Sequence, residues 1–372
     1  MANVLSIVSY KIFPAKFGGQ KGIALFNEYL SRHHKLFCFT VKNNLPGDVP
    51  YRVYNTMENN KLRYVNFFYF FSLRKIILQN NISHVIIEHP YFGWLGLLLK
   101  WFCKVKLIIH SHNIESERFR ATGKWWWKIL SYYEKFIHNN ADFTFCISEK
   151  DRQYFIYRYK VTKEKTSVIT YGISWDKVPA ATERLAARNT LLQTHNLRIE
   201  TTLFLFNGAL DYPPNLEAVK NIVKNINRIF INEQKDYKII ICGKNLPPEM
   251  NGLKIYEDAN IIYAGFVEDI SVYFEGVDIF INPITEGGGI KTKLVEALGS
   301  NLNAVSTLDG ATGVDENICN GKLLLCPNND WQCFSEKMKE AILIKQSITS
   351  DFFQYFYWDN IAKKAAGIIE IV

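Results

Sequence analysis

Several features that would identify other protein classes are missing from this sequence of 372 residues. It has no run of about 20 apolar residues, the length a membrane-spanning helix needs, and its mean hydropathy of −0.08 is too polar for a multispanning membrane protein. The N-terminus has no apolar stretch followed by a small-residue cleavage site, so we expect a cytoplasmic protein. The G-x-x-x-x-G-K-[ST] loop of ATPases and the G-x-S-x-G elbow of many hydrolases are also missing, which leaves both activities without support.

Cysteine pairing is missing as well. The seven cysteines are odd in number, lie mostly in apolar runs and form no C-x-x-C pair, so we expect buried reduced thiols rather than a disulfide framework. Cys319, Cys326 and Cys333 are evenly spaced, but no histidine accompanies them, and we predict no metal site there.

The charge is distributed unevenly along the chain. Residues 1–175 hold 25 Lys and Arg against 11 Asp and Glu, whereas residues 176–372 hold 19 against 25. The basic half also contains three clusters rich in Trp, Tyr and Phe, at residues 63–75, 91–104 and 124–138. Such clusters favour an anionic membrane surface, or alternatively core helices of an aromatic-rich domain. No recognition motif for nucleic acid accompanies the charge, so we expect no nucleic-acid partner.

Short apolar runs alternate with longer helix-like segments in two series. This alternation predicts parallel sheets, and in open parallel sheets ligands gather at the carboxyl ends of the strands. With a link near residues 171–200, the sequence predicts an α/β protein of two Rossmann-like domains that face each other across a cleft. The expected strands lie at residues 4–10, 35–41, 84–88, 105–110 and 142–148, and then at 202–208, 237–243, 260–265, 277–283, 302–307 and 322–326.

The stretch ITEGGGIKTKLVEALG at residues 284–299 places three glycines directly before a short amphipathic segment. Glycine allows φ above zero and a close approach to a ligand. We expect a helix from Ile290 to Leu298 with Gly299 as its C-terminal cap, and the N-terminus of such a helix suits a phosphate. The alternative is an ordinary loop before a helix with a solvated charged face.

The order and spacing of several segments resemble the nucleotide-sugar domain of GT-B glycosyltransferases in the large retaining family 4. The N-terminal half is similar to that family's first glycine loop and helix, its histidine-bearing loop and its exit to the hinge, and the tail is similar to its last helix. The resemblance covers nearly the whole chain. Its segments are residues 207–219, 238–245, 260–274, 278–307 and 310–314, with 14–30, 110–119, 145–155 and 168–174 in the N-terminal half and 356–369 in the tail.

The resemblance assigns roles to the residues around the glycine loop. Glu296 matches the glutamate that accepts hydrogen bonds from the nucleotide ribose, and a carboxylate can accept two O–H donors. Lys291 and Lys293 match the basic pair that neutralises the departing pyrophosphate. Glu286 matches the family's first acidic residue only in part, because nine residues rather than seven separate it from Glu296. The backbone amides expected against phosphate and sugar belong to Gly287, Gly288, Gly289 and Ile290.

Other positions of this half follow the family less closely. Many relatives carry an Arg and a Lys in the segment that here is GALDYPPN, whereas this chain has Leu210, Pro213 and Asn215. The charge of the diphosphate would then be balanced by Lys291, Lys293 and the helix dipole, with Lys244 as a helper. Further donor-binding positions by resemblance are Gly208, in the same segment, and Phe266, which would border the nucleobase or alternatively belong to the core.

In the N-terminal half, Gly18 and Gly19 would let the first loop approach the donor phosphate. His112 lies beside Asn113 and Glu115 in a loop after a strand, where a histidine suits a hydrogen bond to the transferred sugar or to the acceptor. The alternative is a structural histidine.

The resemblance implies a retaining glycosyltransferase of the hexosyl type. It would move a sugar from a UDP or GDP donor to a hydroxyl of a lipid-linked or surface-polysaccharide acceptor, at the inner membrane face and without a metal or other cofactor. The acceptor domain would comprise residues 1–173 plus about 352–372, and the donor domain residues from about 174 to 351. Two alternatives stay open: a catalytically silent nucleotide-sugar-binding subunit of a polysaccharide assembly complex, and a nucleotide-sugar epimerase on the same fold.

Overall fold

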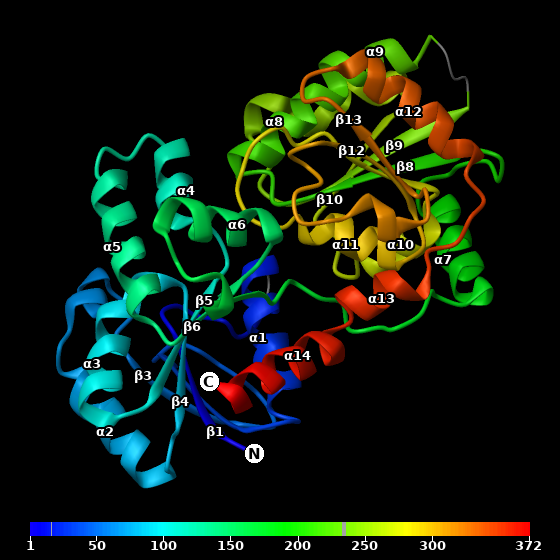
Figure 1. Ribbon diagram of the computed structural model, residues 1–372. Helices are drawn as coiled ribbons and strands as arrows, with labels where there is room; N and C mark the ends of the chain where they lie inside the picture. Colours follow the sequence, from blue (N-terminus) through cyan, green and yellow to red (C-terminus); the bar gives the residue numbers. More distant parts are fainter. Residues whose placement is uncertain (16, 233–235) are drawn as a thin grey trace. The chain divides into compact units, whose positions relative to one another are not determined.

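The computed structural model describes residues 1–15, 17–232 and 236–372. The chain divides into two compact units, each built on a parallel sheet (Figure 1). Unit 1 comprises Met1–Ser174, Gly288–Ile290 and Phe356–Val372, and unit 2 comprises Trp175–Gly287 and Lys291–Tyr355. Residues 352–355, which the sequence placed with the acceptor domain, thus lie in unit 2.

Unit 1 contains a seven-stranded sheet in which every described strand pair is parallel. Inner strands such as His84–Glu88 and Lys106–Ser111 are mostly apolar and buried because helices cover both faces, as parallel sheets require. The strand order is β3-β2-β1-β4-β5-β6-β7, so the direction of winding reverses between β1 and β4. The strands are β1 Asn3–Val8, β2 Lys35–Val41, β3 Arg52–Met57, β4 His84–Glu88, β5 Lys106–Ser111, β6 Phe143–Cys146 and β7 Thr166–Val168.

The helices of unit 1 pack on the two faces of this sheet. One core contains side chains of α1 and of the C-terminal helix α14, which lie side by side (Figure 1). The core on the opposite face contains side chains of α2, α3 and α5. The α-helices are α1 Gly18–Leu30, α2 Tyr69–Asn80, α3 Gly93–Cys103, α4 Glu115–Ala121, α5 Trp127–Asn140, α6 Glu149–Tyr154 and α14 Trp358–Ile371.

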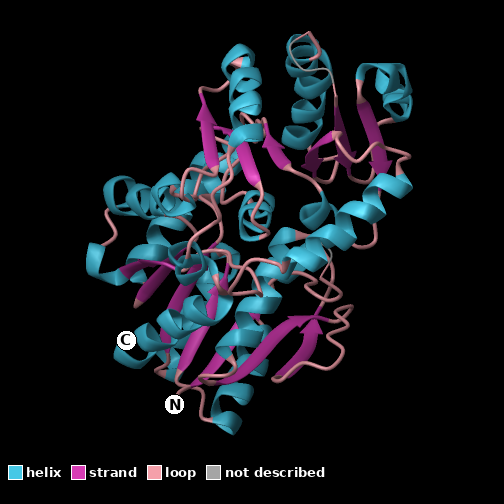
Figure 2. Ribbon diagram, turned by 90° about the vertical axis from the view of Figure 1, so that its right-hand side faces the viewer, coloured by secondary structure: helices cyan, strands magenta, loops and turns pink. Residues whose placement is uncertain are grey.

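Unit 2 contains a six-stranded parallel sheet, also drawn in magenta in Figure 2. Its order is β10-β9-β8-β11-β12-β13, and the winding reverses between β8 and β11. In such sheets ligands bind outside the carboxyl ends of the strands at the point of reversal. The strands are β8 Thr202–Asn207, β9 Tyr237–Cys242, β10 Ile261–Gly265, β11 Ile279–Asn282, β12 Asn303–Thr307 and β13 Leu323–Cys326.

Helices cover this second sheet in the same way. Side chains of α8, α9 and α12 form the core on one face, while α7 and α10 pack on each other and α11 packs on β11 and β12. Asp330 caps α12 by accepting a hydrogen bond from the backbone N–H of Cys333 at 3.0 Å, which satisfies one of the helix's unpaired donors. The α-helices are α7 Ala181–Thr194, α8 Pro213–Asn221, α9 Asn227–Phe230, α10 Ser271–Gly276, α11 Thr292–Gly299, α12 Trp331–Leu343 and α13 Ser350–Phe356.

The predicted α/β class with two Rossmann-like domains is confirmed, and each of the eleven expected strands is present with both ends within two residues of the prediction. Two strands were missed. β3 lies at the sheet edge with one buried residue of six, and β7 has only three residues. The helix after the glycines was placed too early. It begins at Thr292, because Lys291 has the non-helical backbone angles φ −88° and ψ 89°, and Gly299 is its last residue rather than its cap.

Among the residues that the structure describes, none of the helices combines the length and apolar character required to cross a bilayer.

Candidate functional site

Three histidines and two glutamates gather at the carboxyl ends of β4 and β5 in unit 1. Glu88 is the last residue of β4, and its side chain is fully buried. Its Oε2 lies 2.6 Å from His112 Nε2 and 3.0 Å from His110 Nδ1. The His112 ring lies 4.3 Å from the His110 ring and 4.6 Å from the His89 ring, centroid to centroid. The strand register therefore brings together residues that lie more than twenty positions apart in sequence.

The electrostatics of this cluster determine which group carries the proton. Burial raises the pKa of Glu88, but His110 and His112 lower it by more, so the pKa lies well below that of an ordinary glutamate. Burial, followed by the charge of His110, lowers the pKa of His112 to about 3. At neutral pH His112 is thus uncharged and donates its Nε2–H to the ionised Glu88. Its Nδ1 then carries a lone pair that can accept a hydrogen bond.

A second hydrogen-bonded group adjoins the first. His89 has φ +65° and ψ 151°, a backbone conformation that is essentially restricted to glycine. Its Nδ1 lies 2.9 Å from Glu115 Oε1, while Tyr91 Oη at 2.6 Å and Arg118 Nε at 2.7 Å donate to Glu115 Oε2. Burial raises the pKa of Glu115, but His89 and then Arg118 lower it to about 2. Strained backbone held by a network of this kind is typical of functional sites.

The described residues contain one group of side chains that could ligate a metal ion, formed by Glu88, His110 and His112. One donor atom from each lies within 4.8 Å of the others. Oε1 of Glu88 is buried and accepts no hydrogen bond within the described chain. The other carboxylate oxygen, however, is already engaged by His112. The prediction that no metal is needed stays a prediction.

Gly18 and Gly19 are the first two residues of α1. Neither has a positive φ, so they do not form a left-handed turn. The helix start is stabilised by Gln20, whose Oε1 accepts from the backbone N–H of Phe17 at 3.2 Å. Because the first N–H groups of a helix lack carbonyl partners, these glycines leave backbone donors uncovered by side chains. Their role toward a donor phosphate remains a prediction.

The glycine loop of residues 284–291 follows β11 at the carboxyl edge of the second sheet, where the winding reverses. Gly287 has φ +103° and Gly289 has φ +70°, so two of the three glycines occupy conformations that other residues adopt only with strain. Lys291 Nζ donates to the carbonyl oxygen of Gly287 at 2.7 Å, which closes the loop on itself. Residues 288–290 group with unit 1, and the residues on either side with unit 2.

The side chains of α11 separate into two faces, as the sequence predicts. Leu294, Ala297 and Leu298 are fully buried. On the other face Lys293 Nζ donates to Glu296 Oε2 at 2.7 Å, and the Glu296 side chain is only 10% exposed. The structure thus brings together Lys293 and Glu296 in unit 2, whereas His112 and Gly18 lie in unit 1. Glu286 is exposed at the start of the loop.

The remaining predicted donor-binding residues lie at the ends of β8, β9 and β10. A Cβ atom on Gly208 would come within 2.6 Å of the Asn215 side chain, so close packing alone requires glycine there. The backbone carbonyl of Lys244 accepts from Leu210 N at 2.9 Å. Phe266 is 69% exposed, which excludes the alternative that it belongs to the core. These three ends lie at the same edge of the sheet as the glycine loop.

The segment GALDYPPN carries no cation. Leu210 is fully buried in the core of unit 2, and Asn215 Nδ2 donates to the carbonyl oxygen of Ala209 at 2.9 Å. The buried side chain of Leu210 is not available to a diphosphate.

Sequence reasoning missed Glu88, His89, Tyr91 and Arg118 as parts of the site. One signal was present, because the buried run HVIIE ends in the polar pair Glu88–His89 at the carboxyl end of a strand. No signal in the sequence indicated the positive φ of His89, because a positive φ is normally expected at glycine.

Comparison with known proteins identifies families for both halves of the chain. Residues 19–177 match the family described as Glycosyltransferase Family 4, and residues 201–343 match the family described as Glycosyl transferases group 1. A Klebsiella pneumoniae protein described as an uncharacterized 44.6 kDa protein in the cps region is 26% identical over 277 residues, which cover 69% of this chain and 65% of that protein.

The O-antigen biosynthesis glycosyltransferase WbnH of Escherichia coli is 25% identical over 235 residues, covering 63% of this chain and 61% of WbnH. The match therefore spans less than two thirds of the length of either relative. The solved structure of Anabaena Alr3699/HepE in complex with UDP is similar over 100% of both chains, with a TM-score of 0.72 at 14% identity.

Proposed function

The chain belongs to the GT-B glycosyltransferases, with a family 4 first half and a group 1 second half, and on this premise we propose that it transfers a sugar from a nucleoside-diphosphate donor to a hydroxyl. In this reaction the bond between the anomeric carbon and the diphosphate oxygen breaks, and the diphosphate leaves with the electron pair. The acceptor oxygen forms the new bond and its proton passes to an oxygen of the departing diphosphate, and we propose that the anomeric configuration is retained. The acceptor would be a lipid-linked or surface-polysaccharide precursor, the class of molecule suggested by the O-antigen role in the name WbnH.

The observation that carries this proposal is the glycine loop with α11. Glycine occupies the positive-φ positions 287 and 289 of this loop, so no side chain projects from the backbone there. The helix N-terminus supplies unpaired N–H groups and a positive dipole. Lys291 and Lys293 add two cations within the same turn, so negative charge that develops on the departing diphosphate is stabilised without a metal ion.

Glu296 and His112 would hold the two ends of the donor. The carboxylate of Glu296 is nearly buried and charge-paired with Lys293, which keeps it oriented to accept hydrogen bonds from the ribose hydroxyls. His112 is neutral, and Glu88 holds its ring through Nε2. Its Nδ1 would accept a hydrogen bond from a hydroxyl of the transferred sugar or of the acceptor. Glu286, Gly208, Lys244 and Phe266 would complete the donor site.

A peripheral membrane location would bring the protein to a lipid-linked acceptor. Of the aromatic side chains in the basic half, Tyr69 and Phe70 are buried, but many neighbouring rings are not. Phe70 contacts Phe102 of α3 at 5.9 Å, centroid to centroid, which joins the exposed rings at the start of α2 to those at the end of α3. Exposed rings beside lysines and arginines suit the headgroup region of an anionic membrane. The exposed rings are Phe67, Phe68, Phe71, Trp101, Phe102 and Trp125.

The donor proposal is tested first by thermal unfolding of the purified protein with UDP, GDP, ADP, CMP and their common sugars. A ligand that binds only the folded state at a hundredfold excess over its Kd stabilises by about 2.7 kcal/mol, which is readily measured. We expect one nucleotide to raise the Tm of the wild type and to have no effect on Glu296→Ala. If no nucleotide shifts the Tm, the donor proposal is wrong.

A second candidate, the catalytically silent subunit, is favoured by one observation. The positions that carry a basic pair in many relatives here hold a core leucine and a backbone-bonded asparagine. Lys291→Ala with Lys293→Ala separates the two functions. A transferase should lose several orders of magnitude in turnover with the nucleotide sugar found above, whereas a silent subunit shows no transfer before or after the change. Release of an epimerised nucleotide sugar, with no sugar reaching an acceptor, would instead identify the epimerase.

A further inference from the structure

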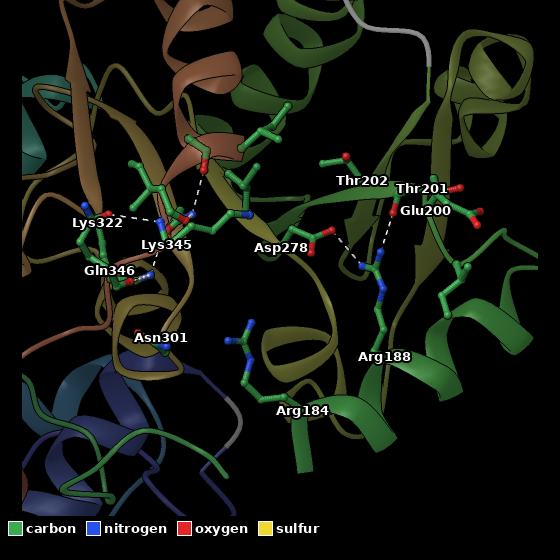
Figure 3. A pocket seen from close by; sticks show the side chains of 16 residues that line it. Arg184, Arg188, Glu200, Thr201, Thr202, Asp278, Asn301, Lys322, Lys345 and Gln346 are labelled. Carbon is green, nitrogen blue, oxygen red and sulfur yellow. Dashed lines mark hydrogen bonds and ion pairs between the residues drawn. The ribbon is translucent and has the colours of Figure 1, made fainter. Parts of the chain in front are cut away.

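One cavity in unit 2 takes no part in the proposed reaction. It has a volume of about 430 Å³ and lies between α7, the amino ends of β8, β11, β12 and β13, and the segment after α12 (Figure 3). Small-molecule sites have volumes of roughly 300–1,000 Å³. Its charged lining residues are Arg184, Arg188, Glu200, Asp278, Lys322 and Lys345.

The cavity and the proposed donor site lie at opposite edges of the same sheet. β8 runs from Thr202, which lines the cavity, to Asn207, which precedes Gly208 of the donor site. With a rise of about 3.3 Å per residue, the six residues of this strand separate the two edges by roughly 20 Å. A ligand that fills this cavity is therefore a different molecule from the sugar donor.

Lys322 is a buried cation without a carboxylate partner. It is only 3% exposed, and its Nζ donates to Asn303 Oδ1 at 2.6 Å and to the carbonyl oxygen of Gln346 at 2.8 Å. No ion pair to Lys322 occurs within residues 1–15, 17–232 and 236–372. Burial and then the charge of Arg184 lower the pKa of Lys322 to about 8. A buried ammonium group with only neutral partners is costly, so an anion beside it would be stabilising.

Arg184 brings a second cation into the same cavity, close enough for its charge to lower the pKa of Lys322. Its Nε donates to the carbonyl oxygen of Glu275 at 3.4 Å, and in the part of the chain described here its two terminal nitrogens have no hydrogen-bond partner. Figure 3 shows the guanidinium directed into the cavity, between Lys322 and Arg188. The nearby carboxylate of Asp278 is already engaged by Arg188 Nη1 at 2.9 Å and by the backbone N–H of Leu203 at 2.8 Å.

We propose that this cavity binds a small phosphorylated metabolite of the sugar-phosphate class, with its phosphate between Arg184 and Lys322. The lining has four cationic side chains against two carboxylates, and a phosphate monoester carries a charge of about −1.5 to −2 at pH 7, so the charges balance. The planar guanidinium can bind two phosphate oxygens at once. Glu200, Thr201 and Thr202 line the same cavity and suit the hydroxyls of a sugar.

The test is isothermal titration of the full-length protein with glucose 6-phosphate, inorganic phosphate and glucose as separate probes. We expect glucose 6-phosphate to bind the wild type more tightly than inorganic phosphate does, and glucose alone not to bind. Arg184→Gln should weaken glucose 6-phosphate binding at least tenfold. The matched control is Arg228→Gln, which removes one cation from an exposed position on α9 of the same unit and should leave binding unchanged.

Two further variants separate this site from the donor site. Glu296→Ala should bind glucose 6-phosphate as the wild type does, so the result does not depend on whether the chain is an active transferase. Lys322→Met, shown by circular dichroism to be folded, should weaken binding as Arg184→Gln does. The proposal is overturned if the wild type does not bind at millimolar probe, if Arg184→Gln binds normally, or if Glu296→Ala abolishes binding. Equal affinity for inorganic phosphate would overturn the assignment to sugar phosphates.

Discussion

Replacing Glu88 with glutamine tests whether the buried carboxylate positions His112. Glu88 Oε2 lies 2.6 Å from His112 Nε2 in a fully buried site, and the carboxylate is ionised because the two histidines hold its pKa low. Hydrogen bonds to charged groups contribute about 1.5–3 kcal/mol. Glutamine keeps the shape of the side chain but removes the charge and allows His112 to take either tautomer.

If the full contribution is lost from the transition state, kcat/KM for the nucleotide sugar should fall roughly 10- to 150-fold, since each 1.36 kcal/mol corresponds to a factor of ten. We expect kcat to carry most of the loss and the KM for the donor to change little, because Glu296 and the lysines that would bind the nucleotide lie in unit 2. Glu88→Asp, which keeps the charge, should retain more activity than Glu88→Gln.

The tautomer of His112 is the measurement that distinguishes the two roles of Glu88. If Glu88 only stabilised the fold, replacing it would leave this tautomer unchanged. In protein labelled with ¹⁵N-histidine, the wild type should show His112 protonated at Nε2 only, and Glu88→Gln should show a mixture. Glu58→Gln is the matched control, because Glu58 is an exposed carboxylate of the same unit, paired with Lys42. A folded Glu88→Gln protein with wild-type kcat/KM and an unchanged His112 tautomer would refute the reasoning.

Three further predictions concern stability, pH and the membrane. Gly287→Ala should lower the free energy of unfolding by about 1–2 kcal/mol in urea titrations, because φ is +103° there. Gly367→Ala, at an open position of α14, should instead raise it by about 0.5–1 kcal/mol, and equal signs for the two variants would contradict the loop geometry. Burial lowers the pKa of His138 to about 3, so below pH 6.5 the unfolded chain binds more protons than the native protein, and His138 makes the wild type lose stability as the pH falls. Against His138→Phe, the wild type should lose about 1 kcal/mol of relative stability per pH unit between pH 6 and 5, and a constant difference would show that the ring is not held neutral. Trp101→Ser with Phe102→Ser should reduce sedimentation with anionic liposomes at low salt severalfold, whereas Ile255→Ser, at an exposed position of unit 2, should not, and undiminished sedimentation of the double variant would exclude this surface.

The fold could be predicted largely because its signals are local. A parallel strand covered on both faces must be apolar over its whole length, so runs such as HVIIE and KLIIHS are visible without knowledge of their neighbours. The same local rule explains the misses. β3 lies at a sheet edge with one residue of six buried, and its pattern lacks such a run.

The candidate site was predicted where it is continuous in sequence. The glycine loop and α11 occupy neighbouring positions, and helical periodicity alone places Lys293 and Glu296 on one face. Periodicity did not locate the first residue of the helix, because the non-helical backbone of Lys291, with ψ 89°, delays the start to Thr292.

The amino-acid sequence by itself thus determined the α/β class, the two parallel sheets, the family and the position of the glycine loop before a helix, since each depends on residues close together in the chain. Tertiary structure alone decided that Glu88 holds His112, which lies 24 positions further on, and that His89 adopts a strained backbone. It also decided that Arg184 and Lys322 line one cavity. The physical reason is that the protonation of a histidine and the cost of a buried cation depend on neighbours that strand register and helix packing supply.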